Sequence, residues 1–372
     1  MKLEIQQEDL QKALAVVANI VPAKTTMPIL TCILLEAKEG QMQLSATNLD
    51  ISVVTSASEV QVKRAGVVAV PAAKFVTFVR SLSPGPVSIE EKGGKISLVA
   101  GKASLEEPSM NAEEFPALPK LAAGKGLDVP ARALVEMVRE TSYAVSRDET
   151  RPALMGILWE VRSDGLMMVA TDAHRLSRSH RLFAWEPARE RDLIVDTQGL
   201  NQLARLAEGQ ETVRLHMAEN QLSFEVGSTI LHSRLLEGPF PDYHAVIPSN
   251  NDKRVVVDRE AFAQAIRRVS ITADRITSQI RLGVESGRME LSGTGTDGSR
   301  AEDEIPISYE GDAMEIGFNF NYLQDILKNI GADSICMLLS DSQSAAVIEP
   351  EGGDREQGDL LCLLMPLRLT GD

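Results

Sequence analysis

The chain has 372 residues, a net charge of −15 and a hydrophobic content of 44%, which is enough for packed cores and excludes a disordered chain. No uncharged apolar run approaches the roughly 18 residues that a membrane span needs, and the start of the chain has no signal-peptide pattern. We therefore expect a soluble cytoplasmic protein. The cysteines Cys32, Cys336 and Cys362 lie far apart in the sequence, without metal-site or redox spacing, which favours reduced and buried thiols.

Six segments are predicted to be helices, because their apolar residues recur at helical spacing or because capping residues open them after a strand. In chain order they are residues 8–19, 72–82, 131–141, 197–207, 259–270 and 320–330. Taken alternately, these helices form two sets of three, and the members of each set are separated by about one domain length. The chain therefore contains an internal repeat.

The predicted strands recur along the chain with the same period as the helices. Met42, Met167 and Met289 each stand in an apolar run that leads into a small or polar stretch, and they are spaced by about 125 and about 122 residues. Two alternating strands follow each second helix, and Gly93 with Gly94 supplies the turn of the first such hairpin. We predict three similar α+β domains, each with two helices and antiparallel sheets, at residues 1–124, 125–251 and 252–372.

An acidic chain normally argues against nucleic-acid binding, but the charge here is uneven. The six helical segments carry a net +4, which leaves −19 on the rest of the chain. Either the helices share an electropositive face, or these residues are the cations that decorate any exposed helix. The candidates are Lys12, Lys74, Arg80, Arg139, Arg205, Arg267, Arg268 and Lys328.

Catalytic motifs are weak. There is no Walker-type loop and no Gly-x-Ser-x-Gly elbow. Residues 293–298 match the dinucleotide pattern, but a charged stretch follows in place of an apolar helix, which favours a turn between strands. Asp172 and His174 could act as acid and base, but a turn-stabilising Asp is commoner and no nucleophile is close in sequence. The five His show no paired ligand spacing, so we expect no metal and no cofactor.

The end of the chain, residues 360–369, is apolar and reads as a final core strand. Pro366 cannot donate a hydrogen bond to a neighbouring strand, so the segment beyond it is predicted to lie at an edge. An apolar chain end that contains Met and stays partly exposed is a plausible groove for a peptide.

Five motifs, which together span most of the chain, resemble the bacterial DNA polymerase III beta subunit family, the sliding clamps. They are KTTMPIL at 24–30, ATDAHRL at 170–176, FPDY at 240–243, MEIGFN at 314–319 and MPLRL at 365–369. The resemblance covers residues 1–369.

The resemblance implies a head-to-tail homodimer in which six similar domains form a ring, with helices around the hole and sheets outside. It implies a non-catalytic processivity factor that encircles duplex DNA without sequence specificity and tethers the replicative polymerase. The implied partners are the DNA polymerase III alpha subunit, the clamp loader, and other polymerases and repair proteins that carry short linear motifs. Neither a cofactor nor a membrane is implied.

The resemblance also implies functional residues. For DNA it adds Lys24 and Arg151 to the eight basic residues of the helices. Between the second and third domains it places a pocket for partner peptides, formed by Leu154, Thr171, Ala173, His174, Arg175, Leu176, Pro241, Val246, Leu363, Met365, Pro366 and Leu367. For the dimer interface it implies Leu105, Glu107, Ile271 and Thr272.

The chain departs from the family pattern at several positions. Ala245 stands where the pocket often has an Arg, and Thr277 where it often has an aromatic residue, so the rim is smaller and less charged. Glu107 replaces the second of two apolar residues at the dimer contact, and residues 151–153 replace aromatics of the DNA-contacting loop. Residues 197–198 replace a basic pair before the fourth helix.

Two other functions compete with this interpretation. One is a divergent clamp paralogue that binds partners as a scaffold without encircling DNA. The other is an enzyme that uses Asp172 and His174.

Overall fold

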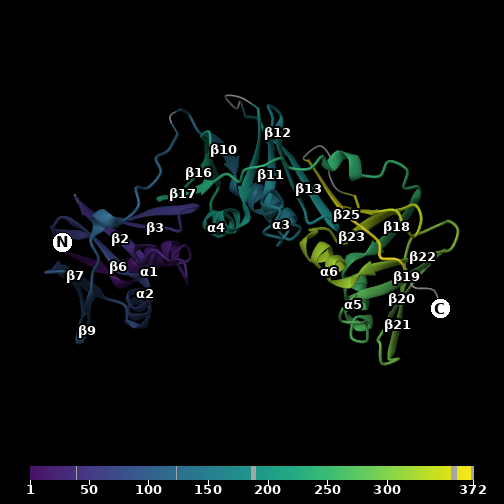
Figure 1. The fold of residues 1–372 in the computed structure, drawn as a ribbon, viewed down its shortest axis with the longest axis horizontal. Coiled ribbons are helices and arrows are strands. Elements are labelled where there is room, and N and C mark those ends of the chain that lie inside the picture. The colour runs from purple at the N-terminus through teal and green to yellow at the C-terminus, as the bar shows by residue number, and fades with distance from the viewer. Residues whose placement is uncertain (39, 123, 186–189, 353–357, 370–372) are drawn as a thin grey trace. The chain divides into compact units, whose positions relative to one another are not determined.

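The computed structural model describes residues 1–38, 40–122, 124–185, 190–352 and 358–369. The chain divides into two compact units. Unit 1 comprises Met1–Val135 and Gln198–Leu235, and unit 2 comprises Glu136–Thr197 and Leu236–Asp372. The division passes through helix α3 (Ala131–Ser142), and each unit is built from antiparallel sheets with helices against them (Figure 1).

Unit 1 contains two antiparallel sheets. The smaller has the order β5-β1-β7-β8-β9, so β5 and β9 are its edge strands. Its strands are β1 (Lys2–Gln6), β5 (Gln61–Arg64), β7 (Pro86–Lys92), β8 (Lys95–Ala100) and β9 (Ala103–Pro108). The larger has the order β10-β15-β16-β17-β4-β3-β2-β6. Its strands are β10 (Leu127–Pro130), β15 (Thr212–Met217), β16 (Gln221–Val226), β17 (Thr229–Arg234), β4 (Ile51–Ala57), β3 (Gln41–Thr47), β2 (Cys32–Lys38) and β6 (Gly66–Pro71).

Three helices of unit 1 lie next to one another. They are α1 (Gln7–Ala18), α2 (Ala72–Ser81) and α4 (Thr197–Ala207). The side-chain amide of Gln7 donates to the carbonyl oxygen of Val79 at 2.9 Å, which joins α1 to α2. The amide of Gln202 donates to the carbonyl oxygen of Val16 at 3.0 Å, which joins α4 to α1. Since α1 also packs on β3 and β4, the three helices cover one side of the unit's sheets (Figure 1).

Unit 2 repeats this plan with a larger and a smaller sheet. The larger has the order β14-β11-β12-β13-β25-β24-β23-β18. Its strands are β14 (Arg191–Asp196), β11 (Gly156–Val161), β12 (Gly165–Thr171), β13 (Arg175–Leu182), β25 (Gly358–Leu364), β24 (Ala346–Pro350), β23 (Ser334–Leu339) and β18 (Lys253–Asp258). The smaller has the order β21-β20-β19-β22, with strands β21 (Arg300–Pro306), β20 (Arg288–Thr294), β19 (Gln279–Glu285) and β22 (Met314–Asn319).

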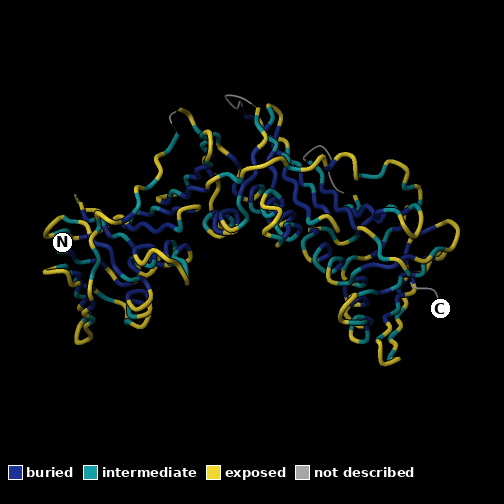
Figure 2. Tube along the Cα trace, in the orientation of Figure 1, coloured by how far each residue is buried: buried dark blue, intermediate teal, exposed yellow. Residues whose placement is uncertain are grey.

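Both faces of the larger sheet of unit 2 are covered. On one face, the Glu140 carboxylate of α3 accepts hydrogen bonds from Ser179 at 2.6 Å and Arg181 at 2.9 Å, both on β13. Helices α5 (Arg259–Val269) and α6 (Phe320–Asn329) pack against each other in the same unit. On the other face, Tyr243 of the 3-10 turn η4 (Tyr243–Val246) packs on the strands. Strand β12, which is covered on both faces, buries six of its seven residues, in keeping with the dark blue tube at its place in Figure 2.

The local predictions from the sequence are confirmed. All six predicted helices are present, with bounds that differ by at most a residue or two. Gly93 and Gly94 have φ values of 63° and 76° and close the hairpin between β7 and β8. Residues 293–298 comprise the end of β20 and most of the turn that leads into β21, so they are not a dinucleotide loop. The three cysteines, all within the described residues, are buried and form no disulfide.

Candidate functional site

The candidate site includes the turn between β12 and β13. The Thr171 hydroxyl donates to the carbonyl oxygen of Arg175 at 2.7 Å. The Asp172 carboxylate accepts from the backbone amides of His174 at 2.9 Å and Arg175 at 3.0 Å. These bonds hold Ala173 at φ +76°, a conformation that costs a residue with a Cβ. Asp172 is therefore the turn-stabilising residue that the sequence favours over a catalytic one.

An apolar cavity of about 270 Å³ opens beside this turn, at the ends of β12, β13 and β25. It is bounded by the turn, by the 3-10 turn η3 (Pro152–Met155) and by η4. The lining residues are Leu154, Thr171, Ala173, Arg175, Leu176, Pro241, Asp242, Tyr243, Val246, Leu363 and Met365. Val246 and Met365 are 54% and 42% exposed, so the apolar wall is open to an incoming ligand.

Nine of the twelve residues predicted for a peptide pocket line this cavity, and His174, Pro366 and Leu367 do not. The carbonyl oxygen of His174 accepts a hydrogen bond from the Met365 amide at 2.9 Å, so His174 lies beside the cavity. The Leu367 amide donates to the carbonyl oxygen of Gly317 at 2.8 Å. The chain end thus runs along β22, an edge strand, as Pro366 led us to expect.

Asp242 and Tyr243 line the cavity although they were not among the predicted pocket residues. Asp242 caps η4 by accepting from the amide of His244 at 3.1 Å. Tyr243 is buried, which raises the pKa of its hydroxyl. Both belong to the FPDY motif, so this motif was the sequence signal from which their place in the cavity could have been predicted. Ala245 and Thr277, where the chain departs from the family pattern, are exposed and do not line the cavity.

The ten basic residues predicted to contact DNA are all exposed. Each of the six helices carries at least one of them. In unit 1 they are Lys12, Lys24, Lys74, Arg80 and Arg205, and in unit 2 they are Arg139, Arg151, Arg267, Arg268 and Lys328. Among the described residues, three of them pair with carboxylates: Lys12 with Asp9 at 3.9 Å, Arg151 with Asp148 at 2.8 Å and Arg268 with Asp303 at 2.5 Å.

The residues predicted for a dimer interface lie on two elements. Leu105 and Glu107 lie on the edge strand β9, and Ile271 and Thr272 follow α5. Ile271 is 83% exposed, which is unusual for so apolar a side chain. Glu107 is only 6% exposed, and one of its carboxylate oxygens has no hydrogen-bond partner among the described residues. Burial raises the pKa of Glu107, and the charge of Lys74 opposes this shift.

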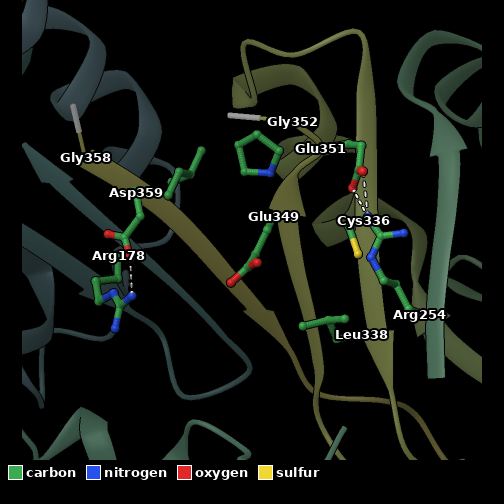
Figure 3. Close-up of a pocket in the computed structure, with 11 residues that line it drawn as sticks. Arg178, Arg254, Cys336, Leu338, Glu349, Glu351, Gly352, Gly358 and Asp359 are labelled. Atoms are coloured by element: carbon green, nitrogen blue, oxygen red, sulfur yellow. Dashed lines mark hydrogen bonds and ion pairs between the residues drawn. The ribbon is translucent and has the colours of Figure 1, made fainter. Parts of the chain in front are cut away.

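A second, polar cavity of about 490 Å³ lies on the same sheet, across β13, β25, β24, β23 and β18. Figure 3 shows two ion pairs in it, Arg178 with Asp359 at 2.8 Å and Arg254 with Glu351, with Glu349 between them. No motif or spacing in the sequence points to this cavity. Its charged residues lie on or directly after four strands, β13, β18, β24 and β25, and only the assembly of the sheet brings them together.

Within the described ranges, no three His, Cys, Asp or Glu side chains gather closely enough to hold a metal ion. Among the helices that the structure describes, none is both long and apolar enough to cross a membrane.

Comparison with known proteins identifies the family. Residues 1–119 match the N-terminal domain of the DNA polymerase III beta subunit, residues 128–242 its central domain and residues 244–368 its C-terminal domain. The fold is therefore the three-domain clamp fold that the sequence predicts. The relatives and solved structures described below carry the name of sliding clamps and not that of an enzymatic activity.

Full-length relatives agree with this match. The beta sliding clamp of Pseudomonas putida is 31% identical over 99% of this chain and 100% of its own length. A sliding clamp structure from Pseudomonas aeruginosa, bound to griselimycin, is 30% identical with a TM-score of 0.93, and it covers 99% of this chain and 100% of that one. The DNA polymerase sliding clamp of Bacillus subtilis is 26% identical with a TM-score of 0.94, and both chains are covered completely. This chain belongs to the DNA polymerase III beta subunit family, the family of the bacterial beta sliding clamps.

Proposed function

We propose that this chain is a processivity factor that closes with a second copy, head to tail, into a ring around duplex DNA. Its three domains, at 1–124, 125–251 and 252–372, would supply half of the six domains of the ring. The observation that carries the proposal is the apolar cavity at the ends of β12, β13 and β25. It is built from segments far apart in the sequence, and these include nine of the twelve residues that the family pattern assigns to a partner pocket.

The DNA contact is electrostatic and independent of sequence. Lys and Arg on helix surfaces can approach phosphates without reading base edges, which suits a ring that must slide. Exposed cations on every helix support this role. The rest of the chain is strongly acidic, which would discourage DNA from binding elsewhere on the protein. We assign this activity to the cytoplasm and assign no catalytic step to it.

The pocket is suited to short linear peptides with apolar anchors. A cavity of about 270 Å³ is large enough for one or two large side chains, and its apolar wall would be covered when they enter. The expected bearers of such peptides are the DNA polymerase III alpha subunit, the clamp loader, and other polymerases and repair proteins. The Pseudomonas aeruginosa relative is described as bound to griselimycin, which supports a ligand-binding role in the family.

The dimer would form through Leu105 and Glu107 of one copy and Ile271 and Thr272 of the other. The exposed side chain of Ile271 supports this assignment, because a second copy would remove it from water. The buried Glu107 favours a second candidate function, that of a clamp paralogue whose ring does not close and which acts only as a scaffold for partners. A buried carboxylate that gains no cation from the second copy weakens association.

Molar mass separates the two functions. By light scattering at micromolar concentration, we expect a mass near twice the 40.4 kDa of the chain. Replacing Ile271 with Asp should shift the protein to the monomer without unfolding it, since the side chain is exposed. A wild-type protein that stays monomeric at micromolar concentration would contradict the ring and favour the function of a clamp paralogue that acts as a scaffold.

A further inference from the structure

Arg175 lines the apolar cavity, but its guanidinium group is bound to structures outside the cavity. The Nε atom donates to Asp172 at 3.2 Å, and one terminal nitrogen donates to the carbonyl oxygen of Tyr143 at 2.6 Å. The other terminal nitrogen donates to Asp325 of α6 at 2.6 Å. The residue is 8% exposed, so it is almost fully removed from water. Because these partners hold the guanidinium, only the aliphatic part of the Arg175 side chain can contact a ligand in the cavity.

Two aromatic rings hold the same guanidinium. Its central carbon lies 4.5 Å from the centre of the Tyr322 ring and 5.3 Å from that of the Tyr143 ring. Tyr322 belongs to α6, and Tyr143 directly follows α3. A planar cation between ring faces and carboxylates is fixed in orientation as well as in charge. The position of the Arg175 stem in the cavity wall therefore depends on two helices.

Asp325 is the partner that can be changed without touching the cavity. It does not line the cavity, and its side chain is 46% exposed. Asp172 already accepts two backbone amides of the turn, so it cannot replace Asp325 as a full partner. A buried guanidinium that loses one of its two carboxylate partners is expected to change conformation, because leaving part of a buried charge unpaired raises the free energy of the folded protein.

We propose that Arg175 is a positioning residue that couples the peptide pocket to helix α6, so that the affinity of the pocket depends on Asp325. This inference rests on the proposed function, since it takes the cavity as the site where partner peptides bind. While the guanidinium is held, the cavity wall is preformed and a ligand enters without ordering it. When Asp325 no longer holds it, the ligand must also bear the cost of fixing the Arg175 side chain.

The coupling runs in both directions, because a linkage between two sites is reciprocal. A ligand that fixes the Arg175 stem also favours the arrangement in which Asp325 and Tyr322 are bound. Helix α6 carries Lys328, one of the basic residues assigned to DNA. The structure thus connects the pocket for partners to one of the helices proposed to face DNA, through direct contacts within unit 2.

The test measures ligand affinity in the full-length protein by fluorescence anisotropy. The probes are griselimycin, used as a competitor, and a labelled hexapeptide with Leu and Phe anchors. Asp325→Asn should weaken both by about fivefold to tenfold, which corresponds to part of one charged hydrogen bond. Asp325→Glu, which keeps the charge, should restore most of the affinity. Asp333→Asn is the matched control, because it removes an exposed carboxylate just after the same helix.

The outcomes distinguish the proposed coupling from a purely structural role of Asp325 and from an error in the proposed peptide pocket. A loss in Asp325→Asn with rescue by Asp325→Glu, at an unchanged affinity of Asp333→Asn, supports the coupling. Equal affinities for Asp325→Asn and Asp333→Asn would overturn it, even where the melting temperature of Asp325→Asn falls, since a purely structural role lowers stability without changing affinity. Failure of the wild-type protein to bind either probe would instead contradict the proposed peptide pocket.

Discussion

The backbone amide of Met365 donates to the carbonyl oxygen of His174 at 2.9 Å, which ties the end of the last strand to the turn between β12 and β13. Two segments almost 200 residues apart thus form one lip of the apolar cavity. After this bond the chain continues to Leu367, whose amide pairs with Gly317. The end of the chain is therefore part of the wall of the site, although it lies outside the regular strand.

Removing the chain from Met365 onward should abolish peptide binding and leave the dimer intact. The truncation removes the apolar Met365 side chain and the bond that holds the lip. The one apolar lining group is worth about 1–2 kcal/mol and the bond to His174 about 0.5–1.5 kcal/mol, so we expect a loss of roughly 1.5–3.5 kcal/mol, which at tenfold per 1.4 kcal/mol makes a micromolar peptide very weak or undetectable. Anisotropy and light scattering should be measured together. A chain that ends at Leu369 is the control, and similar affinities for the two truncations would place the pocket elsewhere.

Replacing Ala173 with Gly should stabilise the protein by about 1 kcal/mol, because Ala173 has φ +76° and Gly adopts this conformation without a steric cost. Urea unfolding measures the change. Ala15→Gly, on the exposed face of α1, should do the opposite and cost about 1 kcal/mol. If Ala173→Gly destabilises as much as Ala15→Gly does, the turn is not strained.

Acid should destabilise unit 1 through His232. This residue is 3% exposed, and burial, with a smaller contribution from His216, lowers the pKa of His232 from 6.5 to about 4. Its folded pKa is depressed, so its contribution to stability is present above pH 6.5 and is lost as the pH falls towards 4. Between pH 7.5 and pH 5 this amounts to about 2 kcal/mol.

The measurement is urea unfolding at these two pH values. We expect the wild type to lose about 2 kcal/mol more stability than His232→Gln on going to pH 5. His244→Gln, at an exposed position, should retain the wild-type dependence. Identical losses for the wild type and His232→Gln would show that His232 does not resist protonation in the folded protein.

The basic residues of the unit 1 helices should set the salt dependence of DNA binding. Each phosphate contact contributes a slope of about 0.9 in log K against log salt, so replacing four such residues with Gln should flatten the slope by up to about 3.6. The four are Lys12, Lys74, Arg80 and Arg205. A matched set of strand residues, each paired with a carboxylate, is Lys63, Arg64, Lys95 and Arg214. Equal slopes for the two variants would mean that the helices do not face DNA.

The helices and hairpins could be predicted because their signals are local. The spacing of Leu10, Leu14 and Val17 specifies the buried face of α1, and Gly93-Gly94 specifies a turn. The pocket residues came from the family pattern, and the structure brings most of them together. The bond between Arg175 and Asp325 could not be predicted, because it spans 150 positions and depends on how α6 packs.

Glu107 shows a different limit. The family pattern implied Glu107 for the dimer interface, yet this side chain is buried within its own chain. A sequence pattern specifies which strand carries a residue, but its burial depends on elements brought in from elsewhere. The same holds for Asp242 and Tyr243, which reach the cavity only because the segment around η4 crosses the sheet.

Encirclement is tested by comparing how long the protein stays on circular and on linear DNA. The protein is loaded by a clamp loader onto nicked circular duplex DNA, separated from free protein by gel filtration, and measured before and after one cut that linearises the DNA. We expect the protein to stay on the circle and to be lost from the linear form, because a ring slides off an end and its contacts are independent of sequence. Equal loss from the circular and linear forms, or equal retention on both, would contradict encirclement.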